Sequence, residues 1–263
     1  MKFTLIGSGF ILPRHAESIN FVGGKIVDII NTAHGGNTWK EAVKNPDVDC
    51  IVILTPNDLH FPIALEALQN NRIVLCEKPL VLNSQDATIL SQYKNIFTTL
   101  QLRYHPLVKK LKEEISRAKK NEIEMDISVY RDEKYYQSWK GQKERSGGVL
   151  FNLGIHYFDL LLYLFGQSRK LQTDFLDDHA GTGVIEGDNF ICRWKVSTGE
   201  RRDNQKRVFK INGVDYNFSS QDNLSYENLH RYVYQDLVKK SGITPEEAGV
   251  SIKLVEDLYS SYK

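Results

Sequence analysis

The chain has 263 residues, 41% hydrophobic and 25% charged, which is long enough for one large or two modest folded domains. Its 34 basic and 33 acidic residues give a formal net charge of +1, so no bulk field attracts nucleic acid or a membrane surface. The sequence shows no apolar run near the ~20 residues that span a bilayer and no signal-peptide cleavage pattern. Its three cysteines lie in apolar runs, which favours a reduced, cytoplasmic protein without a metal or disulfide framework.

Short apolar runs alternate with helical patterns in the first hundred residues. The runs are rich in Ile, Val and Leu, as in strands of a parallel sheet that helices cover on both faces. A Thr-x-x-Glu capping box at residues 38–41 and apolar spacing over residues 61–70 predict helices. We therefore expect a Rossmann-type, doubly wound α/β domain over residues 1–103. Its predicted strands are residues 2–6, 26–30, 50–54, 73–76 and 96–100.

The pattern changes after this point, because apolar and polar residues begin to alternate as in a sheet with one wet face. Residues 104–263 are expected to form an α+β domain with a predominantly antiparallel sheet. The predicted elements are an amphipathic helix over 106–119, a strand over 123–129, an apolar helix over 151–165, a hairpin over 208–218 around Asn212-Gly213, and a final helix with a capping box at 244–247.

A glycine pair follows the first predicted strand. Gly7 and Gly9 would allow a tight turn and a close approach of the backbone to a pyrophosphate at the start of a helix. The third position of this dinucleotide fingerprint is Leu12, and Asn31 stands where an acid usually binds the adenosine ribose. Steric needs of a turn explain such glycines equally well, so the motif alone leaves cofactor binding open.

Two further motifs lie where predicted strands end. Residues 55–60 (TPNDLH) follow the third strand, and residues 76–80 (CEKPL) end the fourth. Ligands of doubly wound sheets bind at the carboxyl ends of the strands. Lys78 stands directly after a buried strand and before a proline, which is an unusual place for a merely solubilising lysine.

Together with residues 147–159 (GGVLFNLGIHYFD), these motifs resemble the Gfo/Idh/MocA oxidoreductases, in order through nearly the whole chain. Residues 10–15, 100–106 and 138–141 are similar to the UDP-N-acetylglucosaminuronic acid 3-dehydrogenase branch, as is Asn152, where most of the family has Asp. The resemblance implies NAD-dependent oxidation of the 3-hydroxyl of a UDP-linked N-acetylhexosaminuronic acid, for surface-polysaccharide sugars. NADP is not excluded. It also implies a UDP-sugar substrate and a homodimer or homotetramer.

The resemblance assigns the chemistry to Lys78 and His156, since oxidising a ring hydroxyl needs a base for its proton. Cofactor-binding residues implied in this way are Gly7, Gly9, Phe10, Ile11, Asn31, Thr55, Pro56, Asn57, His60, Glu77, Lys78 and Gln101. Substrate-binding residues implied in this way are Lys78, Arg103, His105, Trp139, Lys140, Asn152 and His156.

Each of these roles has a structural alternative. His156 also fits a core histidine, Gln101 and Arg103 fit a cap at a domain junction, and Trp139 fits a packing residue. His60 fits a residue that shapes the cofactor loop better than one that reacts.

The chain departs from the family pattern between Ile30 and Cys50. Only about twenty residues separate them, whereas a βαβ unit takes roughly 30 or more. A strand and part of a helix are therefore expected to be missing on the adenosine side, with residues 34–37 as a tight bridge. Three functions remain open: an active sugar-nucleotide dehydrogenase, a family oxidoreductase for another sugar, and a non-enzymatic module that binds a sugar nucleotide or a partner.

Overall fold

The structure, a computed structural model, describes residues 1–32, 38–115, 119–218 and 228–262. Contacts divide the chain into two compact units. The first comprises Met1–Tyr104 and Tyr226–Gly249, and the second comprises His105–Ser225 and Val250–Lys263. The sequence assigned everything after residue 103 to a second domain, whereas the helix Leu229–Val238 (α9) packs in the first unit.

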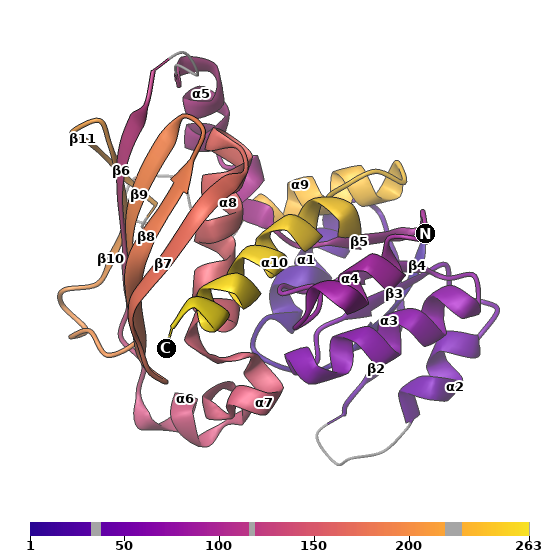
Figure 1. The fold of residues 1–263 in the computed structure, drawn as a ribbon. Helices are drawn as coiled ribbons and strands as arrows, with labels where there is room; N and C mark the ends of the chain where they lie inside the picture. Colours follow the sequence, from indigo (N-terminus) through magenta and orange to yellow (C-terminus); the bar gives the residue numbers. More distant parts are fainter. Residues whose placement is uncertain (33–37, 116–118, 219–227, 263) are drawn as a thin grey trace. The chain divides into compact units, whose positions relative to one another are not determined.

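The first unit is built on a parallel sheet of five strands in the order β2-β1-β3-β4-β5. The Rossmann-type architecture is thereby confirmed. Figure 1 labels β3, β4 and β5 of this sheet and the helices α3 and α4. The strands are β1 (Lys2–Ile6), β2 (Lys25–Ile30), β3 (Cys50–Ile53), β4 (Ile73–Cys76) and β5 (Ile96–Thr98). The helices are α1 (Leu12–Phe21), α2 (Thr38–Lys44), α3 (His60–Gln69), α4 (Ser84–Leu90) and α9, with short 3-10 turns at Asn57–Leu59 (η1) and Gln101–Tyr104 (η2).

Alternating side chains of the strands form the core of this unit. Phe3 and Leu5 of β1 pack with Val52 of β3 against Ile19 of α1 and Tyr234 of α9. Strand pairing also aligns the last residues of all five strands in one row across the sheet. The residues that follow this row therefore lie along one carboxyl edge: Asn31, Gly7, Leu54, Glu77 and Thr99.

β2 forms one edge of the sheet, and its side chains Val27 and Ile29 are exposed. Within the described residues between β2 and β3, α2 is the sole helix or strand. This arrangement agrees with the predicted loss of a strand on this side. The predicted bridge at residues 34–37 lies outside the described residues.

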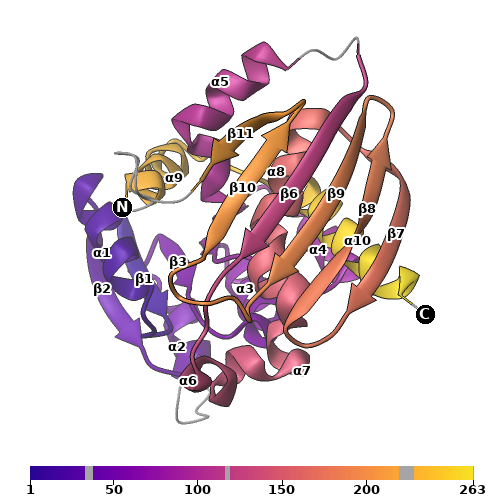
Figure 2. The ribbon, with the colours of Figure 1, turned by 90° about the vertical axis from the view of Figure 1, so that its left-hand side faces the viewer.

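The second unit is built on a six-stranded sheet in the order β11-β10-β6-β9-β8-β7, which Figure 2 shows face-on. All neighbours are antiparallel except β6 and β9, which are parallel. Its elements are α5 (Pro106–Glu114), β6 (Asn121–Ser128), α6 (Glu133–Gln137), η3 (Trp139–Gly141), α7 (Lys143–Ser146), a π-helical turn (Leu150–Gly154), α8 (Ile155–Phe165), β7 (Ser168–Leu176), β8 (Ala180–Gly187), β9 (Phe190–Ser197), β10 (Lys206–Ile211) and β11 (Val214–Asn217). The last helix, α10 (Pro245–Ser261), begins in the first unit and ends in the second.

α8 covers one face of this sheet. Phe158 of α8 meets Trp194 of β9 edge-on at a centroid distance of 5.4 Å, and Phe165 lies 5.8 Å from Phe190. Among the described helices, the stretch Lys143–Phe165 reaches the length and hydropathy of a membrane span, which the sequence analysis did not anticipate. Of its apolar window, 72% is buried inside the protein, as in a core helix.

Phe158→Ala is expected to lower the free energy of unfolding by about 3–5 kcal/mol, because it leaves a cavity beneath Trp194. The matched control is Phe175→Ala, since Phe175 is 44% exposed whereas Phe158 is fully buried. The control should change stability by about 0.5 kcal/mol or less. Urea denaturation of both variants measures the difference, and equal losses would contradict this account of the core.

Candidate functional site

Position 7 lies at the carboxyl edge of the sheet, directly after β1, and two features of the backbone there require glycine. Its φ is +111°, and a Cβ there would lie 2.5 Å from the carbonyl carbon and oxygen of Leu54. Its N–H donates to the carbonyl of Ile30 at 2.8 Å, which joins the turn to the end of β2. Gly9 differs, because no described atom lies within 4 Å of a Cβ built there. The Gly9 backbone thus borders open space just before α1.

Other predicted cofactor residues follow in this loop or directly after β2. Phe10 is 77% exposed and Ile11 is half-buried. Ile11 stands at the N-cap of α1, where no side chain of the described residues accepts from the first turn. Backbone N–H groups and the helix dipole at such a terminus favour an anion such as a phosphate. Asn31 is exposed and directly follows β2.

Two buried polar atoms at the carboxyl edge have no hydrogen-bond partner among the described residues. They are Oγ1 of Thr55, just after β3, and Oε1 of Gln101, just after β5. Leaving a buried acceptor unpaired costs about 1–3 kcal/mol. A ligand with hydroxyl and amide groups, such as a nicotinamide dinucleotide, would satisfy both. The residues of this edge therefore fit such a cofactor.

His60 ties together the two loops that follow β3 and β4. Its Nδ1 lies 2.7 Å from the carbonyl oxygen of Pro79, and its Nε2 lies 3.1 Å from that of Thr55. The ring is fully buried, and burial lowers its pKa. This placement supports a shaping role for His60. Pro56 and the buried Asn57 belong to the same turn, and Lys78 precedes a cis peptide bond to Pro79.

Arg103 and His105 have partners that explain them structurally. The Arg103 guanidinium pairs with Glu247 at 2.9 Å within the first unit, and Glu247 also accepts from the backbone N–H of Thr244 at the start of α10. In the second unit, His105 is buried, and its Nδ1 accepts from the N–H of Leu107 as the N-cap of α5. Neither role needs a ligand.

In the second unit, the π-helical turn before α8 carries Asn152. Its amide donates to the hydroxyl of Tyr135 at 2.7 Å, which fixes the side chain. Turns of this kind often mark functional sites. His156 follows in the first turn of α8 and is half-buried. Asn152 lies in the π-helical turn and His156 in the helix that continues from it.

Lys140 lies beside Tyr135 in the same unit. Its Nζ is 5.6 Å from the centre of the Tyr135 ring and 5.9 Å from that of Trp139. Burial lowers the pKa of Lys140, and the charge of Arg131 lowers it further. A cavity of about 150 Å³ opens here, and its lining includes Tyr135, Lys140 and Thr198. A half-buried cation at a cavity suits an anionic group.

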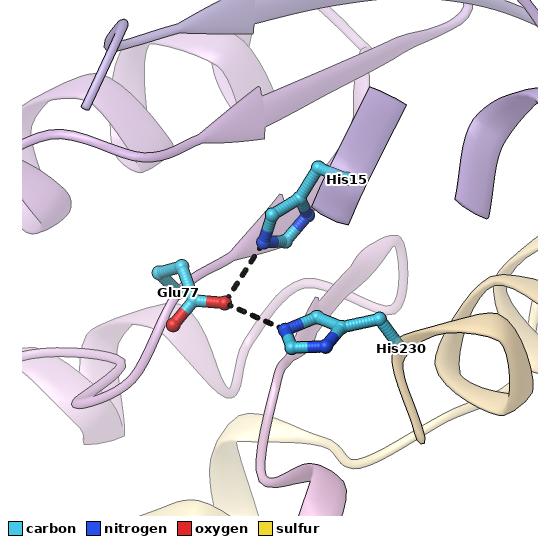
Figure 3. A group of neighbouring side chains, drawn as sticks. All are labelled: His15, Glu77 and His230. Atoms are coloured by element: carbon cyan, nitrogen blue, oxygen red, sulfur yellow. Dashed lines mark hydrogen bonds and ion pairs between the residues drawn. The ribbon is translucent and has the colours of Figure 1, made fainter. Parts of the chain in front are cut away.

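Sequence reasoning missed one buried group in the first unit, formed by His15, Glu77 and His230. Figure 3 shows both imidazoles pointing at the Glu77 carboxylate. The Nε2 of His15 lies 2.9 Å from Oε1 of Glu77, and the Nδ1 of His15 lies 2.9 Å from the hydroxyl of Tyr234. His15 and Tyr234 are 219 residues apart in the chain, so no local signal could have revealed the contact.

The chain matches known proteins over both units. The description "Oxidoreductase family, NAD-binding Rossmann fold" matches residues 27–95, and "Oxidoreductase family, C-terminal alpha/beta domain" matches residues 118–193. Both are parts of the Gfo/Idh/MocA family, and together they cover more than half of the chain.

Solved structures of dehydrogenases resemble this chain over its whole length. The WlbA (WbpB) dehydrogenase from Thermus thermophilus, in complex with NAD and UDP-GlcNAcA, is 28% identical with a TM-score of 0.86, over 97% of this chain and 93% of that one. The WlbA dehydrogenase from Bordetella pertussis, in complex with NADH and UDP-GlcNAcA, is 19% identical with a TM-score of 0.85, over 99% and 95%. At that identity the second likeness shows the fold alone.

Curated relatives have a lower sequence identity or match a shorter part of this chain. Glucose-6-phosphate 3-dehydrogenase from Bacillus subtilis (strain 168) is 23% identical, over 97% of this chain and 71% of that protein. The putative oxidoreductase YteT of the same organism is 27% identical over 49% of this chain, and the match spans only 32% of that relative. With both family parts present in order, the chain belongs to the Gfo/Idh/MocA oxidoreductase family.

Proposed function

We propose that the protein oxidises the 3-hydroxyl of a UDP-linked N-acetylhexosaminuronic acid with NAD as the oxidant. The observation that carries this proposal is the likeness to the Thermus thermophilus dehydrogenase crystallised with NAD and UDP-GlcNAcA, which extends over 97% of this chain. The chain also retains the lysine, asparagine and histidine that the chemistry needs, at Lys78, Asn152 and His156.

Residues at the carboxyl edge of the sheet in the first unit support the proposal that NAD is the cofactor. Gly9 borders open space before α1, where backbone N–H groups would receive a pyrophosphate. Thr55 and Gln101 each present a buried acceptor that lacks a partner among the described residues. Asn31 has no negative charge to repel a 2′-phosphate, so this position does not select NAD over NADP.

The reaction removes a proton and a hydride from one carbinol group. When bound, the nicotinamide accepts the hydride. In our proposal the imidazole of His156 takes the hydroxyl proton, because a neutral imidazole is a competent base near pH 7. We assign to Lys78, as the family resemblance implies, an ammonium that would stabilise negative charge developing on the substrate.

The second unit supports recognition of an acidic sugar. Lys140 is half-buried beside the cavity, and a cation in that setting attracts a uronate carboxylate or a diphosphate. Asn152, held by Tyr135, offers an amide oxygen to a sugar hydroxyl. The exposed edge of β2 favours one competing function, a non-enzymatic module with weakened adenosine binding.

Lys78→Ala and His156→Ala are each expected to lower turnover by about 10²–10⁴, the usual contribution of a positioned acid or base. NADH formation at 340 nm with UDP-N-acetylglucosaminuronic acid measures turnover, with 2-oxoglutarate added as acceptor if the cofactor stays bound. Lys94→Ala is the matched control, since that side chain is 89% exposed. The affinity for NAD should stay nearly unchanged in His156→Ala and in the control. Near wild-type turnover in both site variants would refute the assignment.

Gly9→Ala is expected to weaken NAD binding at least about tenfold without lowering stability. The added methyl meets no described atom of the protein, but it occupies the space given to the pyrophosphate. Gly199→Ala is the control, because its Cβ would have its nearest neighbour at 3.9 Å in the second unit. Calorimetry and thermal unfolding measure the two effects. Unchanged NAD affinity in Gly9→Ala would exclude this loop as the phosphate site.

A further inference from the structure

Three side chains able to bind a metal ion converge inside the first unit. His15 comes from α1, Glu77 follows β4, and His230 comes from the first turn of α9 (Figure 3). We call this group the buried triad. His15 is 0% exposed, His230 is 4% exposed, and the Glu77 side chain is 12% exposed. The triad thus joins segments that lie far apart in the chain.

The distances within the triad suit one shared ion. Oε1 of Glu77 lies 2.9 Å from Nε2 of His15 and 3.6 Å from Nε2 of His230. The three ligand atoms all lie within 4.8 Å of one another. Zinc–nitrogen and zinc–oxygen bonds of about 2.0–2.2 Å place tetrahedral ligand atoms a little over 3 Å apart. Two imidazoles and one carboxylate form a donor set used for zinc and for non-haem iron.

His230 supplies an independent observation. Neither of its ring nitrogens has a hydrogen-bond partner among the described residues, although the ring is buried. The other buried histidines differ: His60 has two carbonyl partners, His15 has Tyr234 and Glu77, and His105 accepts from the N–H of Leu107. A buried polar group without a partner calls for an unseen water or ion. Nε2 of His230 is the atom that faces the Glu77 carboxylate.

The charge of the triad also suits a cation. Glu77 brings a carboxylate to a place where its side chain is only 12% exposed, and a divalent cation would balance that negative charge.

Tyr234 fits as an outer partner of such a site. A metal-bound histidine usually hydrogen-bonds through its other ring nitrogen, which fixes the ring. The Nδ1 of His15 lies 2.9 Å from the Tyr234 hydroxyl. When Nε2 turns its lone pair to the ion, the ring proton moves to Nδ1 and is donated to the Tyr234 oxygen. This tautomer change leaves the imidazole neutral and releases no proton.

We infer that the buried triad binds one divalent transition-metal ion of the zinc class, with water in the fourth position, and that this ion fastens α9 to α1 and β4. The ion has a structural role and takes no part in the proposed oxidation. Because the three ligands come together only in the folded protein, the metal ion binds the folded state and stabilises it by mass action.

The test uses tag-free, full-length protein without NAD or substrate, stripped with a chelator and then dialysed against Zn²⁺ or Co²⁺. We expect one tightly held equivalent by elemental analysis. Bound Co²⁺ should show the intense visible bands of a four-coordinate site, and the melting temperature should rise. His230→Asn should lose the equivalent, the Co²⁺ bands and the thermal shift.

His179→Asn is the matched control, because His179 is an exposed histidine of the second unit and should leave all three readouts unchanged. Glu77→Gln is the second site variant, in case His230→Asn fails to fold. A wild-type protein that holds no stoichiometric Zn²⁺ or Co²⁺ would overturn the inference, as would a folded His230→Asn that retains the metal. Neither result would bear on the proposed oxidation, since no cofactor or substrate is present.

Discussion

The register of the parallel sheet is the constraint on which the first unit depends, because it aligns the last residues of all five strands. Ile30, Ile6, Ile53, Cys76 and Thr98 stand in one row. Every loop that follows the row therefore opens at the same edge of the sheet, although the loops are tens of residues apart in the chain. The glycine turn, the buried acceptors and the Glu77-Lys78 pair owe their common location to this row. The tight contact of Gly7 with Leu54 is a direct result of it.

The fold of the first unit follows from local patterns, but part of the second does not. Buried apolar runs predict the five parallel strands because both of their faces are covered. β7 and β8 were missed because β7 is mostly exposed and β8 is rich in glycine. Gly183 pairs with Trp194 of β9, and a Cβ there would lie 2.1 Å from the carbonyl oxygen of Gln172 in β7 and 3.0 Å from the Trp194 ring. Glycine in this strand lets the β7 backbone and a large side chain approach closely, and it does not mark a turn.

The candidate site also has residues that local sequence patterns predict and contacts that they do not. Motifs next to strand ends locate Gly7, Thr55 and Lys78, because each needs only its own strand and turn. Sequence could not reveal that Arg103 pairs with Glu247 or that His230 reaches Glu77, since both contacts require the return of the 226–249 segment to the first unit. The same return explains why a single boundary near residue 103 describes the chain incompletely.

The central claim is transfer of a hydride from C3 of the sugar to a nicotinamide held at this edge. The most direct measurement uses UDP-N-acetylglucosaminuronic acid carrying deuterium at C3, incubated with the wild-type protein and NAD⁺ and analysed by mass spectrometry. The account predicts that the deuterium appears on C4 of the nicotinamide ring of NADH, with a 3-keto sugar formed in equal amount. Formation of neither product at millimolar NAD⁺ would contradict the account and favour a non-enzymatic binding module.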